Sequence, residues 1–284
     1  MKKTITAILA VLMIVSLLAV NLSAAQGDYK AASGTPIVDG VKDDLYIAAD
    51  PVPMKVDNDG NPSKGATGTA YFLWDAKYLY AYVDVVDPVL TTKKADAIYQ
   101  TDSVEVYVDF DGNVAAGKTA KVTDAGVNAG QWTAGLLYEG EWGGYGNHHT
   151  ENKDKGTFKV KTTDKGYAVE YQIPFVKYTP AAAAKIGFTI AINDDANNDS
   201  TRDYQIFPAK GQGSAWSTVD GNWCLMTLSA DKYTPPTTAA AAPAAAGAAA
   251  KPAAAAQTAD ITVITAIVSM AIASGAVLSL KKRK

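Results

Sequence analysis

The sequence predicts an all-β domain, an antiparallel β-sandwich of jelly-roll-like character, followed by one C-terminal transmembrane helix. Short runs rich in β-branched and aromatic residues recur through the middle of the chain, and several alternate apolar with polar residues. Each run stops at a cluster of Asp, Asn or Gly residues, which adopt tight turns at low cost. Between the two ends of the chain no long helical period occurs. Regularly spaced short strands bounded by turns are typical of a sandwich.

The predicted strands follow one another through the aromatic part of the chain. All 26 aromatic residues lie between Tyr29 and Tyr233, and the folded domain is therefore assigned to residues 26–233. Strands are expected at residues 69–74, 78–85, 103–109, 156–161, 167–173 and 186–192, and turns at residues 75–77, 109–113, 163–166 and 193–199.

The N-terminal residues 1–25 have the composition of a secretory signal peptide. Lys2 and Lys3 supply a positive start, residues 5–20 supply an apolar stretch, and residues 22–25 supply small side chains for cleavage. The mature protein is therefore expected to begin near Gln26.

The C-terminal part predicts a linker and an anchor. Residues 234–258 are almost entirely Ala, Pro and Thr, and because the prolines interrupt any helix, we interpret this segment as a stalk. Residues 261–280 carry no charge and are long enough to cross a bilayer, and four basic residues end the chain. A transmembrane anchor over residues 259–284, with its basic tail in the cytoplasm, places the domain on the extracellular face of the cell membrane or cell wall of a Gram-positive bacterium.

The layout of this C-terminal part is similar to a Gram-positive sortase sorting signal. Thr258 matches the usual motif, whereas the Leu-Pro start and the Gly after Thr are absent. A membrane anchor is therefore the preferred interpretation, and cleavage by a sortase is the alternative.

Charge and cysteine content exclude several classes of protein. The chain has 26 basic and 29 acidic residues. Six of the basic residues lie at the two ends, which leaves 20 basic and 29 acidic residues in the middle. This balance argues against a nucleic-acid partner, because phosphates require clustered Lys and Arg. The single Cys224 excludes a disulfide framework and a four-cysteine zinc site.

The residues that perform catalysis in known enzymes form no motif in this sequence. His148 and His149 are adjacent in a Gly-rich segment, which we expect to be an extended loop in which neighbours point apart. No nucleophile elbow, P-loop or dinucleotide-binding glycine motif occurs. A glycoside hydrolase needs two facing carboxyl groups, for which Asp102, Glu105 and Asp109 are the candidates. A polar strand face or ligand hydrogen bonding explains these acids more simply.

Calcium binding is suggested by acidic turns. Oxygen-bearing side chains alternate along three of them, the spacing by which a turning chain surrounds Ca²⁺, although none completes an EF-hand and Asp and Asn are also ordinary turn residues. We predict structural calcium sites at two turns, with the ligands Asp109, Asp111, Asn113, Asp195, Asn197 and Asp199; the third turn, residues 57–61, ranks lower.

Two aromatic residues lie where local packing does not explain them. Tyr99 belongs to a polar run just before a strand, and Trp216 lies in a flexible segment of Gly and Ser. A pyranose presents C–H bonds above and below its ring, so flat apolar faces bind it, while polar side chains bind its rim of hydroxyls. Trp74 and Trp223 lie within strand patterns and are expected in the core.

A resemblance to a known family is carried by blocks of residues in a fixed order. The blocks are residues 34–40, 73–80, 85–90, 100–109 and 186–194. In these blocks the middle of the chain resembles the family 9 carbohydrate-binding modules, a β-sandwich family found in xylanases and bacterial surface proteins. The resemblance implies a sugar held between two rings, at Tyr99 and Trp216, with a polar partner at Glu105, and it implies bound calcium.

The sequence departs from the pattern of that family at three places. Tyr99 replaces the usual Trp, Gly213 replaces an Asn with Gln212 beside it, and the family's sugar-contacting Arg has no counterpart in residues 131–133. The predicted carbohydrate-binding residues are Tyr99, Trp216, Glu105, Asp102, Gln212 and Trp132.

The sequence thus predicts a non-catalytic, membrane-tethered domain that binds a polysaccharide or oligosaccharide of the xylan or cellulose type. Two alternatives stay open: a structural surface-layer or adhesion protein with the same sandwich, and a weak glycoside hydrolase using Asp102 or Glu105. A haem-binding sandwich would require axial ligands, for which Met54 and a histidine are the candidates.

Overall fold

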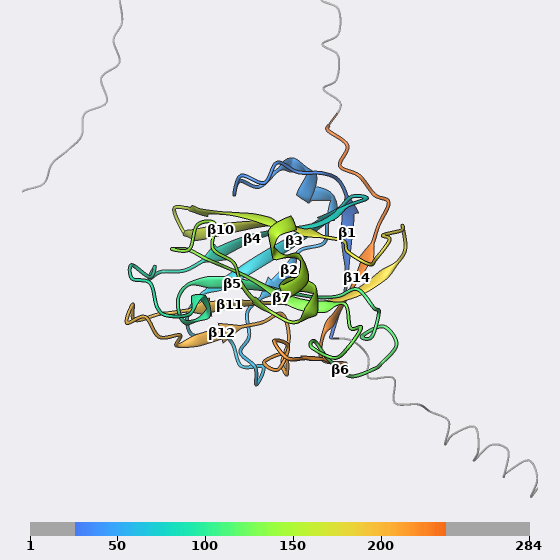
Figure 1. The fold of residues 1–284 in the computed structure, drawn as a ribbon. Helices are drawn as coiled ribbons and strands as arrows, with labels where there is room; N and C mark the ends of the chain where they lie inside the picture. Colours follow the sequence, from blue (N-terminus) through green and yellow to red (C-terminus); the bar gives the residue numbers. More distant parts are fainter. Residues whose placement is uncertain (1–25, 237–284) are drawn as a thin grey trace, which may run out of the picture. The chain divides into compact units, whose positions relative to one another are not determined.

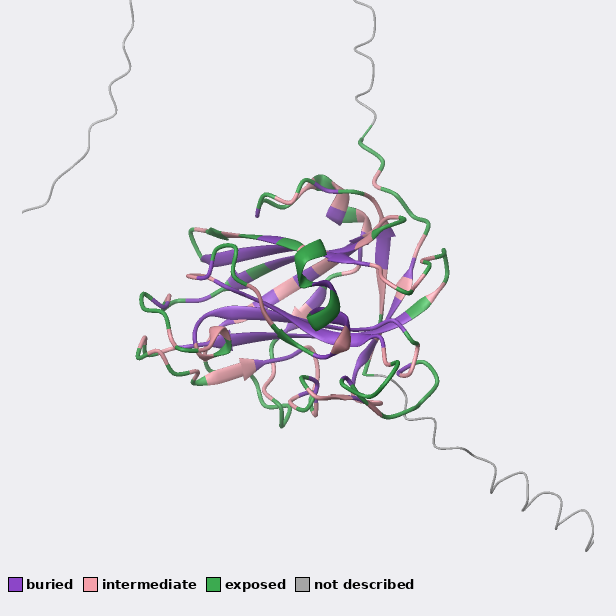
Figure 2. Ribbon diagram, viewed as in Figure 1, coloured by how far each residue is buried: buried purple, intermediate pink, exposed green. Residues whose placement is uncertain are grey.

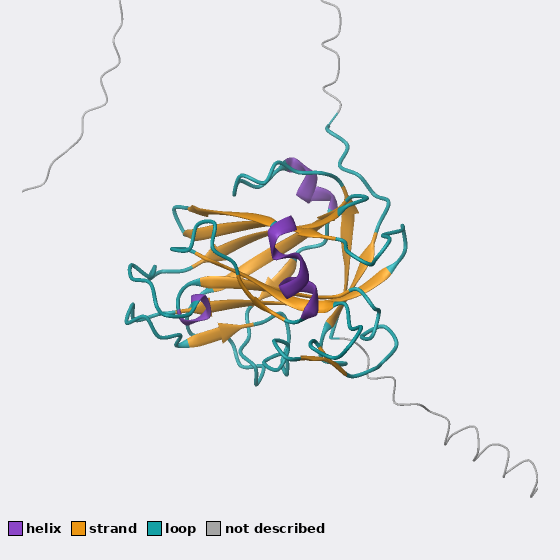
Figure 3. Cartoon of the chain, viewed as in Figure 1, coloured by secondary structure: helices purple, strands orange, loops and turns teal. Residues whose placement is uncertain are grey.

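The computed structural model describes residues 26–236 (Figure 1). The predicted signal peptide, the stalk beyond residue 236 and the predicted transmembrane anchor lie outside these residues. Within the described part of the chain, no helix is both long and apolar enough to cross a membrane. The described residues form mostly strands joined by loops, with a few short helical segments (Figure 3). The predicted all-β class is confirmed.

The strands form two layers. The first contains, in spatial order, β8 (Gly143–Tyr145), β7 (Ala129–Gly135), β5 (Ser103–Asp109), β11 (Lys185–Asp194) and β14 (Cys224–Leu228), with β12 (Tyr204–Ile206) on β11. The second contains β3 (Thr67–Trp74), β4 (Tyr78–Val86), β10 (Gly166–Pro174) and β9 (Thr157–Thr162), with β2 (Val52–Met54) on β3. A separate pair is made by β6 (Ala120–Lys121) and β13 (Thr218–Val219). The helical segments are η1 (Asp44–Ala48), η2 (Ile98–Gln100), α2 (Asn147–Asn152) and η3 (Lys153–Lys155).

Strand β1 (Asp28–Ser33) connects the two layers. Its first part, from Asp28 to Ala31, pairs with β14, and its last two residues, Ala32 and Ser33, pair with β3. Both of these pairings are parallel, whereas every other strand pair of the described residues is antiparallel. The predicted antiparallel arrangement therefore needs correction at β1, which runs along the edges of both sheets and joins them.

All six predicted strands are present, with ends that differ from the prediction by at most two residues. They are β3, β4, β5, β9, β10 and β11. The expectation of an extended loop at His148 and His149 was wrong, because these residues lie in α2. Gly146, at the start of that helix, has a φ of 89°, a conformation that favours glycine and lets the chain turn into the helix.

The main core lies between the two layers, where the central strands are largely buried, whereas most of the connecting loops are exposed or half-buried (Figure 2). In β5 the side chains of Val104, Val106 and Val108 belong to this core. A second, smaller apolar cluster around Tyr107 and Trp223 lies on the other face of β5 and β11, where residues 207–223 cover part of the sheet. The uncovered part of that outer face forms the site described below.

We predict that Phe188→Ala lowers the free energy of unfolding by about 3–5 kcal/mol, because it leaves a cavity where the layers meet. Phe188 is fully buried, and its ring packs edge to face against Phe72 and Tyr29, with centroid distances of 5.1 and 5.9 Å. Urea unfolding measures the change. Ile37→Ala is the control: Ile37 is 72% exposed, so this change should cost no more than about 0.5 kcal/mol.

Candidate functional site

A cleft lies on the outer face of the first layer, over β5 and β7. The valines of β5 face the core, so Glu105 and Tyr107 point to the opposite side. The register places Glu105 beside Thr133 and Tyr107 beside Gln131 of β7, and these four residues line the cleft. Its volume is about 620 Å³. The other lining residues come from loops, η2, β8 and β12: Asp96, Ala97, Ile98, Tyr99, Trp142, Gly143, Gly144, Tyr145, Arg202, Gln205, Gly213 and Trp216.

Three exposed aromatic rings border this cleft. Tyr99, Tyr145 and Trp216 expose 44%, 44% and 52% of their surface, and no other Phe, Trp or Tyr among residues 26–236 is exposed. Leaving a large apolar side chain in water forgoes about 1.5–3 kcal/mol of burial free energy. Because all three rings gather around one concavity, the cleft is the best candidate for a ligand site.

Glu105 is the centre of a hydrogen-bonded floor. Its Oε1 accepts a hydrogen bond from Gln131 Nε2 (2.7 Å), and its Oε2 accepts one from Gln205 Nε2 (2.9 Å) and one from the Tyr107 hydroxyl. Burial raises the pKa of Glu105, while the hydrogen bond from Tyr107 and the charge of Arg202 act in the opposite direction. The amide oxygens of Gln131 and Gln205 take no part in these bonds and are available as acceptors for a ligand.

Arg202 is the only basic residue among the described residues that line the cleft. Its Nη1 donates a hydrogen bond to Asn193 Oδ1 (2.8 Å), and its guanidinium lies 5.6 Å from the ring centroid of Tyr99. Asn193 in turn donates from Nδ2 to Ser103 Oγ (3.0 Å). A guanidinium has several N–H donors in a fixed plane, so donors that this network does not use can reach ligand oxygens.

The structure brings three of the six predicted carbohydrate-binding residues, Tyr99, Glu105 and Trp216, together in the cleft. The prediction omitted Gln131 and Thr133, although both flank Trp132 and therefore share the face opposite to it. It also omitted Arg202 and Gln205, which had no local signal and reach the cleft because the chain folds back after β11. Tyr145 was omitted as well, although it is a large ring in a Gly-rich segment, the same kind of signal as that of Trp216.

Trp132 and Gln212 lie outside the cleft, which corrects the prediction for both residues. Trp132 is fully buried on the core side of β7, because adjacent strand residues face opposite sides, and its Nε1 donates to His148 Nδ1 (3.1 Å). Gln212 is also buried, and its Nε2 donates to the Asn222 carbonyl (2.9 Å). The neighbouring Gly213 lines the cleft in its place.

Asp102 is likewise turned away from the cleft. It lies an odd number of residues before Glu105, so the two carboxylates point to opposite faces of the strand. Its Oδ2 accepts a hydrogen bond from the Thr91 backbone N–H (2.7 Å), and its Oδ1 accepts one from that of Asp195 (3.1 Å). Asp102 and Glu105 therefore do not form the facing pair of carboxyl groups that glycoside hydrolysis requires.

The first predicted calcium turn is stabilised by hydrogen bonds of its own. Asp109 Oδ1 accepts from Asn113 Nδ2 (3.0 Å), and Asp109 Oδ2 accepts from the Val114 N–H (3.0 Å). Asp111 Oδ2 accepts from the Asn128 N–H (2.5 Å). These are bonds of the kind that Asp makes in turns without an ion.

The second predicted calcium turn has the same character. Asp195 Oδ1 accepts from the Asp199 N–H (2.9 Å), and Asp195 Oδ2 accepts from the Ser200 N–H (2.9 Å). Asn197 Nδ2 donates to Asp203 Oδ1 (3.3 Å). The six predicted ligands thus lie in two hydrogen-bonded turns, and calcium binding at either turn stays a prediction.

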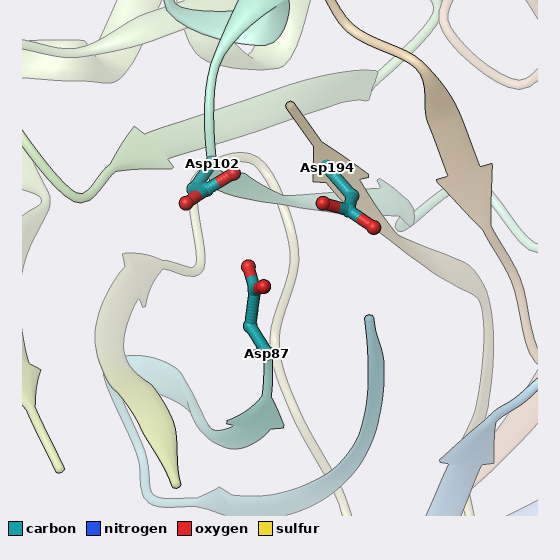
Figure 4. A group of neighbouring side chains, drawn as sticks. All are labelled: Asp87, Asp102 and Asp194. Atoms are coloured by element: carbon teal, nitrogen blue, oxygen red, sulfur yellow. The ribbon is translucent and has the colours of Figure 1, made fainter. Parts of the chain in front are cut away.

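A different set of acids comes together in the structure. Asp87, Asp102 and Asp194 point toward one another from the end of β4, the start of β5 and the end of β11 (Figure 4). One carboxylate oxygen of each lies within 4.8 Å of the others, and all three side chains are buried. Among the described residues this is the only group of three or more acidic, His or Cys side chains so arranged.

The three carboxyl groups fit a hard cation. Asp87 Oδ2 and Asp194 Oδ1 are buried without a hydrogen-bond partner, and so is the hydroxyl of Tyr167, whose pKa is raised by burial and by these acids. Burial raises the pKa of Asp87 to about 7 and that of Asp102 to about 6. Ca²⁺ takes oxygen ligands at about 2.3–2.6 Å, so two ligands on opposite sides lie ~5 Å apart, consistent with this spacing.

Two neutral histidines pack behind the wall of the cleft. His148 Nδ1 accepts from Trp132 Nε1, so Nε2 carries the proton and donates to the Pro174 carbonyl (3.0 Å). His149 packs against Trp132 and Trp142, with centroid distances of 5.0 and 6.5 Å, and its Nε2 has no partner. Burial lowers the pKa of each histidine to about 4.

Comparison with known proteins identifies one family. The family described as "carbohydrate family 9 binding domain-like" matches residues 38–229. Endo-1,4-β-xylanase C of Paenibacillus barcinonensis is 30% identical over 199 residues, which are 70% of this chain and 17% of that protein. Endo-1,4-β-xylanase A of Thermoanaerobacterium saccharolyticum and exoglucanase XynX of Acetivibrio thermocellus are each 32% identical over 193 residues, 67% of this chain and 15% and 16% of those proteins. The chain thus spans less than a fifth of these relatives.

Solved structures share the fold. A family 9 carbohydrate-binding module from Caldicellulosiruptor kristjanssonii in complex with cellotriose aligns with a TM-score of 0.59 at 20% identity, over 72% of this chain and 94% of that chain. A structure of such a module from the same organism in complex with glucose aligns with a TM-score of 0.56 at 21% identity, over 72% of this chain and 96% of that one. At these identities the likeness establishes the fold.

From the two buried histidines we predict that the folded protein loses stability in acid. Their pKa of about 4 in the folded protein lies below the ordinary value of 6.5, so the unfolded chain takes up protons first as the pH falls. The free energy of unfolding is therefore unaffected by these histidines above pH 6.5 and decreases as the pH falls from 6.5 toward 4.

His149→Phe keeps a ring and removes the titrating group. It should reduce the loss of unfolding free energy between pH 6.5 and pH 4 by about 2 kcal/mol, measured by urea unfolding at several pH values. Equal pH slopes for the variant and the wild type would contradict the assignment.

Proposed function

The chain belongs to the carbohydrate family 9 binding domain-like family, and from this membership and the cleft we propose that the domain binds carbohydrate without catalysing a reaction on it. The observation that carries the proposal is the gathering of all exposed aromatic rings of the described residues around one cleft with a polar floor. The bound molecule would be an oligosaccharide or a segment of a polysaccharide.

The binding mechanism follows from the chemistry of a pyranose. Tyr99 and Trp216 offer flat apolar faces to the C–H bonds of the sugar ring. Amide oxygens of Gln131 and Gln205 accept hydrogen bonds from sugar hydroxyls, and Arg202 donates hydrogen bonds to sugar oxygens. Because sugar hydroxyls must leave water to make these bonds, affinities should be micromolar rather than nanomolar.

We propose a β-1,4-linked glucan or xylan as the ligand class. The proposal is supported by the names of the relatives, which are xylanases and an exoglucanase, and by the sugars, cellotriose and glucose, in the structures that share the fold. The relatives are several times longer than the matched segment, so their catalytic names describe whole proteins of which this domain resembles one part.

We further propose that Asp87, Asp102 and Asp194 hold a structural Ca²⁺. The support is the pair of unpartnered carboxylate oxygens and the burial of three carboxyl groups close together without a counter-ion. These acids come from segments far apart in sequence, so an ion here would tie the ends of β4 and β11 to the start of β5.

The location of the domain at the cell surface is also proposed. It rests on the sequence alone, on the signal-like residues 1–25 and the uncharged residues 261–280, which lie outside the described residues. A carbohydrate-binding domain carried by such an anchor would hold polysaccharide at the cell.

We predict that the wild-type protein binds xylo- or cello-oligosaccharides and that Trp216→Ala weakens this binding at least about tenfold, because the most exposed stacking face of the cleft is lost. Isothermal titration calorimetry measures both affinities.

Ile47→Ala is the matched control for this experiment, since Ile47 is 65% exposed and lies outside the cleft; it should bind as the wild type does. If the folded wild-type protein released no heat with any of these sugars, the proposal would fail and the structural surface-protein alternative would be favoured.

We predict that calcium raises the melting temperature by about 5–10 °C at concentrations far above its dissociation constant. Asp87→Asn should abolish most of this shift, whereas Asp164→Asn, at an exposed turn outside the candidate calcium turns, should keep it. The calcium affinity should rise with pH from 5 to 8, because Asp87 and Asp102, with pKa values of about 7 and 6, must lose their protons. A melting temperature that calcium and a chelator leave the same would refute the site.

A further inference from the structure

We propose that Tyr145 forms a second sugar subsite beside Trp216, and that the two rings together select a chain with the twist of xylan. This inference rests on the proposed carbohydrate binding and names the residue that binds a second sugar unit. Tyr145 is not among the carbohydrate-binding residues predicted from the sequence.

Tyr145 is placed to contact a ligand rather than the core. It is the last residue of β8, the edge strand of the first layer, and 44% of its surface is exposed. Its ring centroid lies 5.7 Å from that of Trp216, which is 52% exposed. Two neighbouring rings that are both half exposed form a continuous apolar surface over more than one sugar unit.

Glycines let β8 pack closely against β7 and η2. A Cβ on Gly143 would lie 3.2 Å from Ile98 Cδ1 and 3.2 Å from Thr133 Cβ, and both of these residues line the cleft. A Cβ on Gly144 would collide with the carbonyl oxygen of Gln131. Without side chains at these two positions β8 lies close beside β7, and this places Tyr145, the last residue of β8, in the lining of the cleft.

The cleft has room for more than one sugar ring. Its volume of about 620 Å³ lies within the range of about 300–1,000 Å³ that is usual for small-molecule sites. One pyranose, with roughly a dozen non-hydrogen atoms, fills only part of this space. A second unit therefore fits between the first unit and the edge of β8.

The tilt between the two rings favours a twisted chain. Their planes meet at 56°. In a cellulose-like chain, successive sugar units are turned by half a revolution, so their faces are parallel and fit coplanar rings. In a xylan-like chain, successive units are turned by a third of a revolution, so their faces are inclined to each other, as Tyr145 and Trp216 are. The 5.7 Å between the rings is comparable to the spacing of one sugar unit along either chain.

The test compares a monosaccharide with a disaccharide. Isothermal titration of the whole protein with xylose, xylobiose, glucose and cellobiose gives the ratio of disaccharide to monosaccharide affinity. In the wild type we expect xylobiose to bind about tenfold more tightly than xylose, with a smaller ratio for cellobiose over glucose. Tyr145→Ala should bring the xylobiose ratio close to one, and Tyr145→Phe, which keeps the ring, should retain it.

The outcomes separate this inference from the proposed function. If no sugar bound to the wild type, carbohydrate binding itself would fail. If sugars bound but Tyr145→Ala weakened the binding of xylose and of xylobiose by the same factor, Tyr145 would only hold the ring of Trp216 in place, and the second subsite would be refuted. If the wild type showed the same affinity ratio for cellobiose over glucose as for xylobiose over xylose, the selection by ring tilt would be refuted. Urea unfolding of Tyr145→Ala verifies that the variant is folded.

Discussion

The pairing of β5 with β7 on one side and with β11 on the other is the constraint on which the rest of the structure depends. This register turns the valines of β5 into the core and turns Glu105 and Tyr107 outward, next to Thr133 and Gln131. A slip of one residue would exchange the two faces and bury Glu105 among apolar side chains. The core and the floor of the cleft are therefore two consequences of one set of backbone hydrogen bonds.

The sequence was informative wherever the signal was local. Strands such as β3, β4 and β11 could be predicted because alternation and turn residues lie within each run. Tyr99 and Trp216 could be predicted because a large ring in a polar segment has no local packing partner. The parallel pairing of Asp28 with Leu225 could not, because it joins opposite ends of the domain. The same holds for Arg202, which reaches the cleft only through the fold.

The acid cluster and the cleft share one segment of backbone. Asp194 follows Asn193, which holds the guanidinium of Arg202, and the N–H of Asp195 donates to Asp102 of the cluster. A cation at the cluster would therefore restrain the start of the loop that carries Arg202. Restraining that loop before a ligand arrives lowers the ordering cost of binding, so structural calcium and sugar affinity are expected to be coupled.

The floor and the rings have different parts in recognition. Glu105 already accepts hydrogen bonds from Gln131, Gln205 and Tyr107, so the floor is ordered in the free protein. Sugar hydroxyls that bind there exchange hydrogen bonds with water for equivalent ones, which adds little net free energy but fixes orientation. The exposed rings lose unfavourable contact with water when a sugar covers them. Affinity should therefore depend on the rings, and the choice of hydroxyl pattern on the floor.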